Sequence, residues 1–129
     1  MNHRCEKLKM KECSNIIQNK SRAVLATCNF NKPHEELVFY DTDCFCGCIS
    51  VFFDVCKSGD VIENLENNNS ASLLITNKCN NIIEIVTLEG TLHTIEENDD
   101  CCCNRQNNRC FQKLEFKVSK VSGKRLIKC

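Results

Sequence analysis

Cysteine is the residue type whose number and spacing first suggest chemistry, because the chain has 13 cysteines among 129 residues. Thiolates bind soft metal ions and carry redox reactions. Cys44, Cys46 and Cys48 alternate, so an extended backbone would place three thiols on one face. Residues 101–103 form a second cluster with Cys110 in polar sequence. These clusters leave open a metal site or a redox-active thiol protein.

The wider pattern favours reduced structural thiols over a cysteine-based site. Neither cluster has the two-residue spacing of zinc knuckles or the spacing of ferredoxin runs. The cysteine count is odd, and Cys28 and Cys56 sit in apolar runs where thiols act as small buried hydrophobes. The first residues contain no apolar signal-peptide core, and no apolar run approaches the ~18 residues that span a bilayer. We therefore expect a cytoplasmic protein whose thiols are mostly free and buried.

Charge and length limit the classes of partner. Lys plus Arg equals Asp plus Glu at 17 each, so no overall field favours nucleic acid or an anionic membrane. The length fits a single domain over residues 1–129. His34 and His93 are candidates for ligand contacts, although hydrogen-bonded structural histidines are the more frequent case. We expect no nucleic-acid and no membrane partner.

The elements that would position these residues are mostly strands. Apolar runs and alternating patterns predict six strands, and helical spacing predicts two helices. The first helix belongs to a leading segment over residues 1–20, while residues 97–110 are expected to form a mobile loop and 122–129 a tail. The expected strands are 22–30, 36–40, 49–53, 72–75, 82–95 and 114–118, and the expected helices are 4–19 and 60–68.

Local signals refine these elements. Residues 31–33 and 41–43 read as turns, and residues 77–81 read as a third one. Asp60 followed by Glu63 suggests a capping box that begins the second helix. Gly90 lies in the middle of a long strand and suits a bulge. Strands this close in sequence cannot all be parallel, because parallel pairs need long crossovers, so an antiparallel barrel with one inserted helix is predicted.

The order and wording of these elements resemble a known family. Residues 21–27 (Ser-Arg-Ala-Val-Leu-Ala-Thr) look like the opening strand of pyridoxamine 5'-phosphate oxidase-like proteins, and residues 31–34 resemble the turn that follows. Residues 57–59 and 62–68 are similar to the loop and helix of the nitroimidazole-resistance and small flavin-reductase branch, and 89–92 to a glycine-bearing strand. This resemblance covers about residues 4–121. It implies a six-stranded split β-barrel that forms a homodimer and holds FMN in the clefts between subunits.

The resemblance also implies site residues. On the first strand it assigns cofactor contacts to Arg22, Val24, Leu25, Ala26 and Thr27, with Arg22 suited to a bidentate phosphate contact. In the loop before the second helix it assigns cofactor contacts to Val55, Cys56, Lys57 and Ser58.

One departure from the family pattern concerns the phosphate. Asp60 and Val61 occupy the positions where the family carries two basic residues, so Lys57 and Ser58 would have to substitute for them. No side chain declares itself as catalytic, because a flavin carries the redox chemistry. The resemblance implies an FMN-dependent oxidoreductase acting on an unidentified small molecule. The alternatives are a dimeric barrel that has lost its flavin site, and a cysteine-rich metal or redox-thiol protein.

Overall fold

The computed structural model describes residues 3–45, 48–96 and 111–128 of the chain. Within those ranges it has seven strands and two helices, all strand pairs being antiparallel. Along the chain the elements are β1 (His3–Lys7), α1 (Met10–Asn19), β2 (Arg22–Asn29), β3 (Lys32–Phe45), β4 (Cys48–Cys56), α2 (Asp60–Leu65), β5 (Ser70–Cys79), β6 (Ile82–Thr94) and β7 (Phe111–Lys128).

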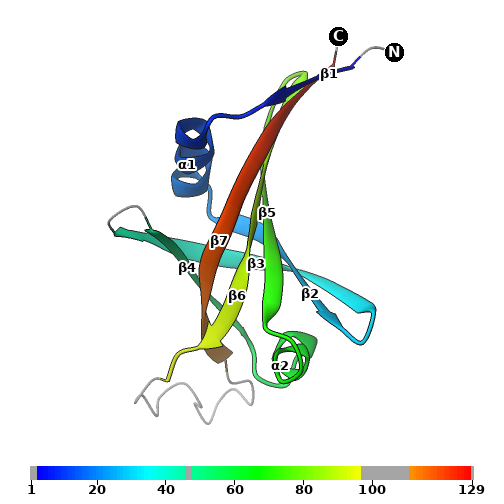
Figure 1. The fold of residues 1–129 in the computed structure, drawn as a ribbon, viewed down its shortest axis with the longest axis vertical. Coiled ribbons are helices and arrows are strands. Elements are labelled where there is room, and N and C mark those ends of the chain that lie inside the picture. Colours follow the sequence, from blue (N-terminus) through cyan, green and yellow to red (C-terminus); the bar gives the residue numbers. More distant parts are fainter. Residues whose placement is uncertain (1–2, 46–47, 97–110, 129) are drawn as a thin grey trace.

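Six of the strands close into a barrel in the order β7-β4-β3-β2-β5-β6, because β6 pairs back onto β7. The seventh strand, β1, adds to the outer edge of β7. Figure 1 shows β1 beside the end of β7, with α1 packed next to them and α2 at the opposite end of the barrel. The predicted antiparallel split barrel is confirmed, with one strand more than expected.

The barrel is split because β3 changes partners halfway along its length. Its first half, Lys32 to Phe39, pairs with β2, and its second half, Tyr40 to Phe45, pairs with β4. Helix α2 packs against both β2 and β4 near the place where these two strands are not paired with each other. Residues 41–43, which the sequence suggested as a turn, are therefore part of β3.

Tight two-residue turns join β2 to β3 and β5 to β6. Phe30 and Asn31 both have positive φ, at 48° and 68°, and a two-residue hairpin with positive φ at both central residues has the twist of the flanking strands. Asn80, with φ 53°, begins the turn between β5 and β6. Pro33 does not lie in the first turn as expected; it belongs to β3, opposite Cys28. The asparagines thus mark the turns, and the proline does not.

Gly90 is the bulge that the sequence predicted. The register of β6 against β7 shifts between Glu89 and Gly90. A Cβ atom at Gly90 would lie 2.0 Å from the carbonyl oxygen of Lys117, a distance that no side chain tolerates. The close approach of the two backbones therefore requires glycine at this position.

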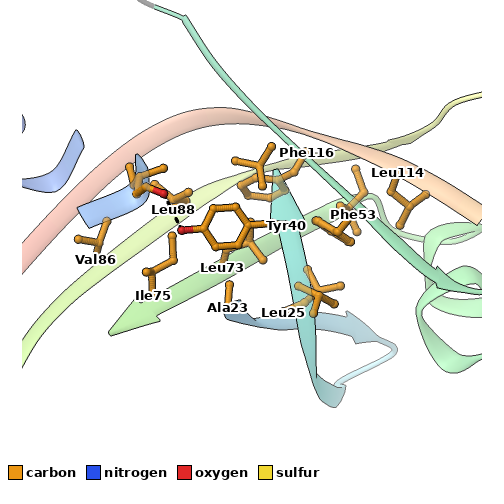
Figure 2. Packing of buried hydrophobic residues seen from close by; sticks show 14 of the residues in the cluster. Ala23, Leu25, Tyr40, Phe53, Leu73, Ile75, Val86, Leu88, Leu114 and Phe116 are labelled. Carbon is orange, nitrogen blue, oxygen red and sulfur yellow. Dashed lines mark hydrogen bonds between the residues drawn. The ribbon is translucent and has the colours of Figure 1, made fainter. Parts of the chain in front are cut away.

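The core fills the barrel with inward-facing side chains of every barrel strand. Figure 2 shows Tyr40 in the middle of this cluster, with its hydroxyl on the side where Ile75 and Leu88 lie. That hydroxyl donates a hydrogen bond of 2.7 Å to the carbonyl oxygen of Ile17, which lies in the last turn of α1. Burial raises the pKa of Tyr40 to about 12. The bond thus ties the barrel interior to the end of the leading helix.

The beginning and end of the chain differ from the sequence prediction. The leading helix begins at Met10, because His3 to Lys7 form β1, and the expected tail over 122–129 is strand β7 up to Lys128. Gly123 makes room for this arrangement, since a Cβ atom there would lie 2.6 Å from Cys13 Sγ. The Gly123 carbonyl accepts a 2.9 Å hydrogen bond from the Leu8 N–H.

An ion-pair cluster fastens these terminal elements together. Arg125 on β7 contacts Glu6 on β1 at 3.2 Å, Glu12 on α1 at 2.6 Å and Glu84 on β6 at 2.8 Å. The hydrogen bonds that Arg125 donates to these carboxylates raise its pKa above its already high value. The pKa of Glu12 is lowered by a hydrogen bond from the Lys9 N–H and by Arg125. One guanidinium therefore joins four elements.

Helix α2 is shorter than predicted and has a different cap. It ends at Leu65, and Gly59 occupies the N-cap position without a side-chain hydrogen bond, so the capping box of Asp60 and Glu63 is wrong. The predicted loop over 97–110 lies outside the described residues. In the part of the chain that the structure describes, no helix is both long and apolar enough to cross a bilayer.

Candidate functional site

Strand β2 divides the residues predicted to bind a cofactor between its two faces. Leu25 is fully buried in the core, and Thr27 accepts a hydrogen bond of 3.0 Å from the Asn64 side chain of α2. Val24 and Ala26 alternate with them and face outward, and Arg22 is exposed. A ligand on the outside of the barrel would therefore meet Val24, Ala26 and Arg22 through side chains, and Leu25 and Thr27 only through backbone atoms.

The outer surface of β2 is part of a broader face, called here the β2 face. It consists of the outward side chains of β2, of β5 and of the first half of β3. Cross-strand neighbours share a face, so the register places Leu37, Val24 and Leu74 in one row. Leu37 and Leu74 are 58% and 39% exposed, and Phe39 beside Arg22 is 69% exposed. The β2 face therefore presents an apolar centre to its surroundings.

A hollow of about 270 Å³ lies at the end of the β2 face that is nearest to α1. Its wall combines the apolar row with two cations, Lys20 and Arg22. The lining residues are Asn19, Lys20, Ser21, Arg22, Ala23, Val24, Leu37, Leu74 and Thr76. We call it the Arg22 hollow.

A larger hollow of about 640 Å³ lies at the other end of the same face, where β2, β5 and β6 meet. Small and hydroxyl-bearing residues dominate its lining, and Gly90 contributes the bulge. The lining residues are Ala26, Thr27, Cys28, Pro33, Asn68, Ser70, Ala71, Ser72, Thr87, Glu89, Gly90, Thr91 and Ser119. This hydroxyl hollow offers hydrogen bonds to a neutral polar ligand, and its one charged lining residue is Glu89.

The second predicted group, residues 55–58, does not line either hollow. Val55 is buried in the core, while Lys57 and Ser58 are exposed. Cys56 Sγ and Ser58 Oγ lie 3.3 Å apart, and the Cys56 carbonyl accepts a hydrogen bond from the Gly59 N–H at 3.0 Å. The structure thus separates Lys57 from the hollow that Arg22 lines.

The start of α2 does not fit a phosphate. Val61 is 1% exposed and packs in the core. Asp60 lies 3.5 Å from His34 Nδ1, and the other ring nitrogen of His34 is 2.9 Å from Glu36 Oε1. Within residues 54–66 there is one cation, Lys57, against the four carboxylates of Asp54, Asp60, Glu63 and Glu66. This segment repels anions, so a phosphate would have to be held elsewhere.

The remaining candidate residues are the two histidines and the cysteines of residues 44–48. Both candidate histidines are hydrogen-bonded, His34 to Glu36 and His93 to Thr91 Oγ1 at 2.8 Å, as expected of structural histidines. No group of three or more metal-ligating side chains occurs among the described residues. Backbone register places Cys44 opposite Ile49 and Cys48 opposite Phe45, so these two cysteines sit on different strands of a hairpin and not along one extended segment.

The cysteine predictions are met in part. Among the six cysteines whose side chains the structure describes there is no disulfide, and only Cys13 of these six is fully buried. Cys28 and Cys56, expected to be buried, are partly exposed. Burial raises the pKa of the Cys13 thiol, which keeps it protonated. Cys46, residues 101–103 and Cys110 lie outside the described residues, so the second cluster stays untested.

Comparison with solved structures places this barrel among known ones. A FAD-binding protein from Mesorhizobium loti superposes with a TM-score of 0.79 at 13% identity, covering 98% of this chain and 100% of that one. A candidate 5-nitroimidazole antibiotic resistance protein from Bacteroides thetaiotaomicron gives 0.75 at 12% identity, over 98% and 90%. A candidate pyridoxamine 5'-phosphate oxidase from Corynebacterium glutamicum gives 0.73 at 9% identity, over 97% and 100%.

The chain has the fold of the pyridoxamine 5'-phosphate oxidase-like split barrels. No family model matches the sequence, and no curated protein matches it either. At these identities the likeness establishes the split-barrel fold and leaves the ligand to the chain's own residues.

Two features of the split barrel's β2 face were not predicted from the sequence. Lys20 was counted with the leading segment, yet it lines the same hollow as Arg22. Ser70 and Ser72 line the hydroxyl hollow and were treated as ordinary strand residues. The sequence did contain a signal that Lys20 could lie near Arg22, because Lys20 comes directly after the helix and two residues before Arg22.

Proposed function

We propose that this chain is a homodimeric flavin-binding protein that holds FMN against the β2 face and serves as an oxidoreductase for a small molecule. The observation that carries the proposal is the combination on one face of an apolar row, Val24, Leu37 and Leu74, with the cation of Arg22. A flavin needs an apolar wall for its ring and a cation for its phosphate. The FAD-binding protein from Mesorhizobium loti, which has the same fold, adds support.

A second copy of the chain is the proposed cover of this face. Exposed Leu37, Phe39 and Leu74 form an apolar patch that a soluble monomer would leave in water. Packing two β2 faces about a twofold axis buries the patch and creates two equivalent clefts. Each cleft would combine the Arg22 hollow of one subunit with the surface of the other, which could bring the Lys57 loop of the partner chain within reach.

In this cleft the residues of the chain would bind and orient the ligand. FMN, when bound, supplies hydride or electron transfer. The row of Val24, Leu37 and Leu74 would exclude water from one side of the ring, and backbone groups of β2 would lie along its edge. Arg22 would hold the phosphate by charge-assisted hydrogen bonds, and the site uses no acid or base from its own side chains.

The experiment is a titration of FMN into the purified protein, followed by quenching of flavin fluorescence. We expect Arg22→Ala to weaken FMN binding about ten- to hundredfold, because a charged hydrogen bond is worth roughly 1.5–3 kcal/mol. The matched control is Lys117→Ala, which removes an exposed cation from the opposite side of the barrel and should leave the affinity unchanged. Equal affinity in Arg22→Ala and wild type would remove Arg22 from the site.

A dimeric barrel without a cofactor is the second candidate, and the acidic start of α2 is the observation that favours it. Asp60 stands where the resemblance implies a cation, and Val61 is buried. Sedimentation and flavin titration separate the two functions. A dimer at micromolar concentration that ignores both FMN and riboflavin would support the second candidate, whereas a monomer would contradict both.

A further inference from the structure

We propose that Lys20 and Arg22 form an oxyanion-binding subsite at the junction of α1 and β2, which takes the phosphate or carboxylate of a ligand whose apolar body lies on the β2 face. This inference rests on the proposed function, because it specifies which end of the ligand the site recognises. It adds a residue, Lys20, and gives the bound ligand a direction along the face.

The backbone at this junction is fixed on both sides. Lys20 is the C-cap residue of α1, and its N–H donates to the Ile16 carbonyl at 3.1 Å. Ser21 follows, and its carbonyl accepts a hydrogen bond from the Tyr40 N–H at 2.9 Å. Arg22 is the first residue of β2. Two cations two residues apart therefore extend from a rigid helix-to-strand connection into one hollow.

The charges that line the Arg22 hollow favour an anion. Its lining residues contain two cations and no carboxylate. The adjoining hollow, which shares Lys20, has two carboxylates, Glu12 and Glu84, and both are paired with Arg125. Among the described residues, neither Lys20 nor Arg22 takes part in an ion pair, so their charges are available to a ligand. The carbonyl groups at the end of α1 would oppose an anion, but Ile17 already accepts the Tyr40 hydroxyl and Ile16 the Lys20 N–H.

The rest of the β2 face directs an anion to this end. Along β2, the row after the apolar one places Glu35 opposite Ala26, and on the next strands Ser72 lies opposite Glu89. Glu89 lines the hydroxyl hollow, and Glu35 lies opposite Ala26, which also lines it; in the sequence, four more carboxylates accompany Lys57 within residues 54–66. The face is therefore cationic at the α1 end, apolar in the centre, and hydroxyl-rich and acidic at the far end.

This order implies a ligand whose oxyanion lies next to its apolar body. Two sources can supply the oxyanion. One is the phosphate of FMN folded back over the apolar row, and the other is a separate aromatic acid or phosphate ester bound beside the flavin ring. Both would contact Lys20 and Arg22 in the same way, so the chemistry of the subsite is the same and the experiment must distinguish the source.

The test measures affinities for three probes: FMN, riboflavin and phenyl phosphate. Fluorescence quenching reports the flavins, and isothermal titration calorimetry reports phenyl phosphate. The variants are Lys20→Ala and Lys57→Ala, with Lys11→Ala as the matched control because Lys11 is an exposed lysine of the same helix. Thermal unfolding of each variant checks that the fold is kept, which the exposure of these lysines leads us to expect.

We expect Lys20→Ala to weaken phenyl phosphate binding about tenfold, and Lys11→Ala to leave it unchanged. If the oxyanion is the flavin phosphate, Lys20→Ala also weakens FMN about tenfold and leaves riboflavin unchanged. If the oxyanion belongs to a separate ligand, Lys20→Ala leaves the affinities for FMN and riboflavin unchanged and weakens only the binding of phenyl phosphate. Either pattern supports the subsite and identifies the source.

Two results would overturn the subsite. One is unchanged phenyl phosphate affinity in Lys20→Ala, and the other is an equal loss in Lys20→Ala and Lys11→Ala, which would indicate general charge attraction. A tenfold loss of FMN in Lys57→Ala with none in Lys20→Ala would place the phosphate at the α2 loop instead. If neither flavin binds wild type, the proposed function fails, while the phenyl phosphate measurement still decides the subsite.

Discussion

Two outer faces of one barrel differ in how their side chains meet the surroundings. The β2 face presents an apolar row with Leu37 and Leu74. The opposite face, called the β7 face, is formed by the outward side chains of β4, of the part of β7 that pairs with β4 (Phe111 to Lys117) and of the second half of β3. On it Asp54 lies opposite Lys113, and Ser50 Oγ donates to Glu115 Oε2 at 3.1 Å.

The difference supports the proposal that a second copy of the chain covers the β2 face. Both faces belong to strands with equally apolar inward sides, so the core does not distinguish them. On the β7 face Asp54 lies opposite Lys113 and Ser50 is hydrogen-bonded to Glu115, while Phe111 at its edge is 45% exposed. The β2 face has no such pairing in its apolar row, which is typical of the centre of a protein interface. The four predictions below test this contrast.

The largest effect is expected from Phe39→Asp, with Phe111→Asp as its matched control. Phe39 is 69% exposed on the β2 face, and Phe111 is 45% exposed on β7, opposite Cys56. A twofold interface would bury two copies of the new carboxylate, so we expect the dimer to weaken by about a thousandfold or more. Phe111→Asp should leave it intact. Sedimentation velocity measures both, and equal behaviour would erase the contrast.

Gly90→Ala should have the next largest effect, because β6 joins the two faces at this residue. Gly90 lies opposite Ala71 of β5 and Val118 of β7. A methyl group would overlap the Lys117 carbonyl, so we expect a loss of roughly 2–4 kcal/mol in the free energy of unfolding, as for other overpacked positions. Gly59→Ala, where the nearest atom is 3.2 Å from the added carbon, should cost far less. Urea unfolding measures both, and similar losses would show that the bulge is dispensable.

Tyr40 reports on the place where β3 passes from one face to the other. It is the only tyrosine, and the chain has no tryptophan, so its ultraviolet absorbance follows a single group. Because burial raises its pKa from 10.0 to about 12, we expect no phenolate absorbance at pH 10.5. Half-ionised tyrosine near pH 10 in a folded sample would mean that the junction is open to solvent.

The smallest effect should come from Glu12→Gln, which removes a charge that belongs to neither face. The pKa of Glu12 is lowered from 4.5 by its hydrogen bonds with the Lys9 N–H and Arg125, so its ionised form stabilises the fold above the unfolded pKa. This contribution is lost as the pH falls through the lowered value. Wild type should therefore exceed Glu12→Gln in stability at pH 7 and lose that advantage as the pH falls below 4.5 and through the lowered pKa. A constant difference in urea unfolding across this range would contradict the lowered pKa.

The fold was predictable where local pattern and tertiary packing agree. An apolar run marked β2, alternation marked the first part of β7, and Gly90 marked the bulge in β6. The prediction failed for β1, whose residues His3 to Lys7 carry no strand pattern of their own. They are a strand because β7 offers an edge and Arg125 holds Glu6, and both lie far away in the sequence. Long-range pairing of this kind leaves no local signal.

The candidate site was predictable only in part for a related reason. The sequence indicated Arg22 and the outward residues of β2, but it grouped Lys57 with them. Which cation shares a hollow with Arg22 depends on where α1 ends against the barrel, and that is set by the Tyr40 hydroxyl and the Ile17 carbonyl. The sequence shows Ser70 and Ser72 of β5, but no local pattern indicates that both line the hydroxyl hollow.

The Arg125 cluster has a consequence for how the chain reaches its fold. It joins Arg125 to Glu6, residues separated by 119 positions, next to a strand pair between β1 and the end of β7. During synthesis β1 emerges early and has no partner until β7 has left the ribosome. Contacts of such high sequence separation form late, because the loop between them must close first. The edge of β1 is therefore exposed to other nascent chains until β7 has been made, and its mixed charges, Arg4 and Glu6 among them, reduce the risk of edge-to-edge aggregation in that interval.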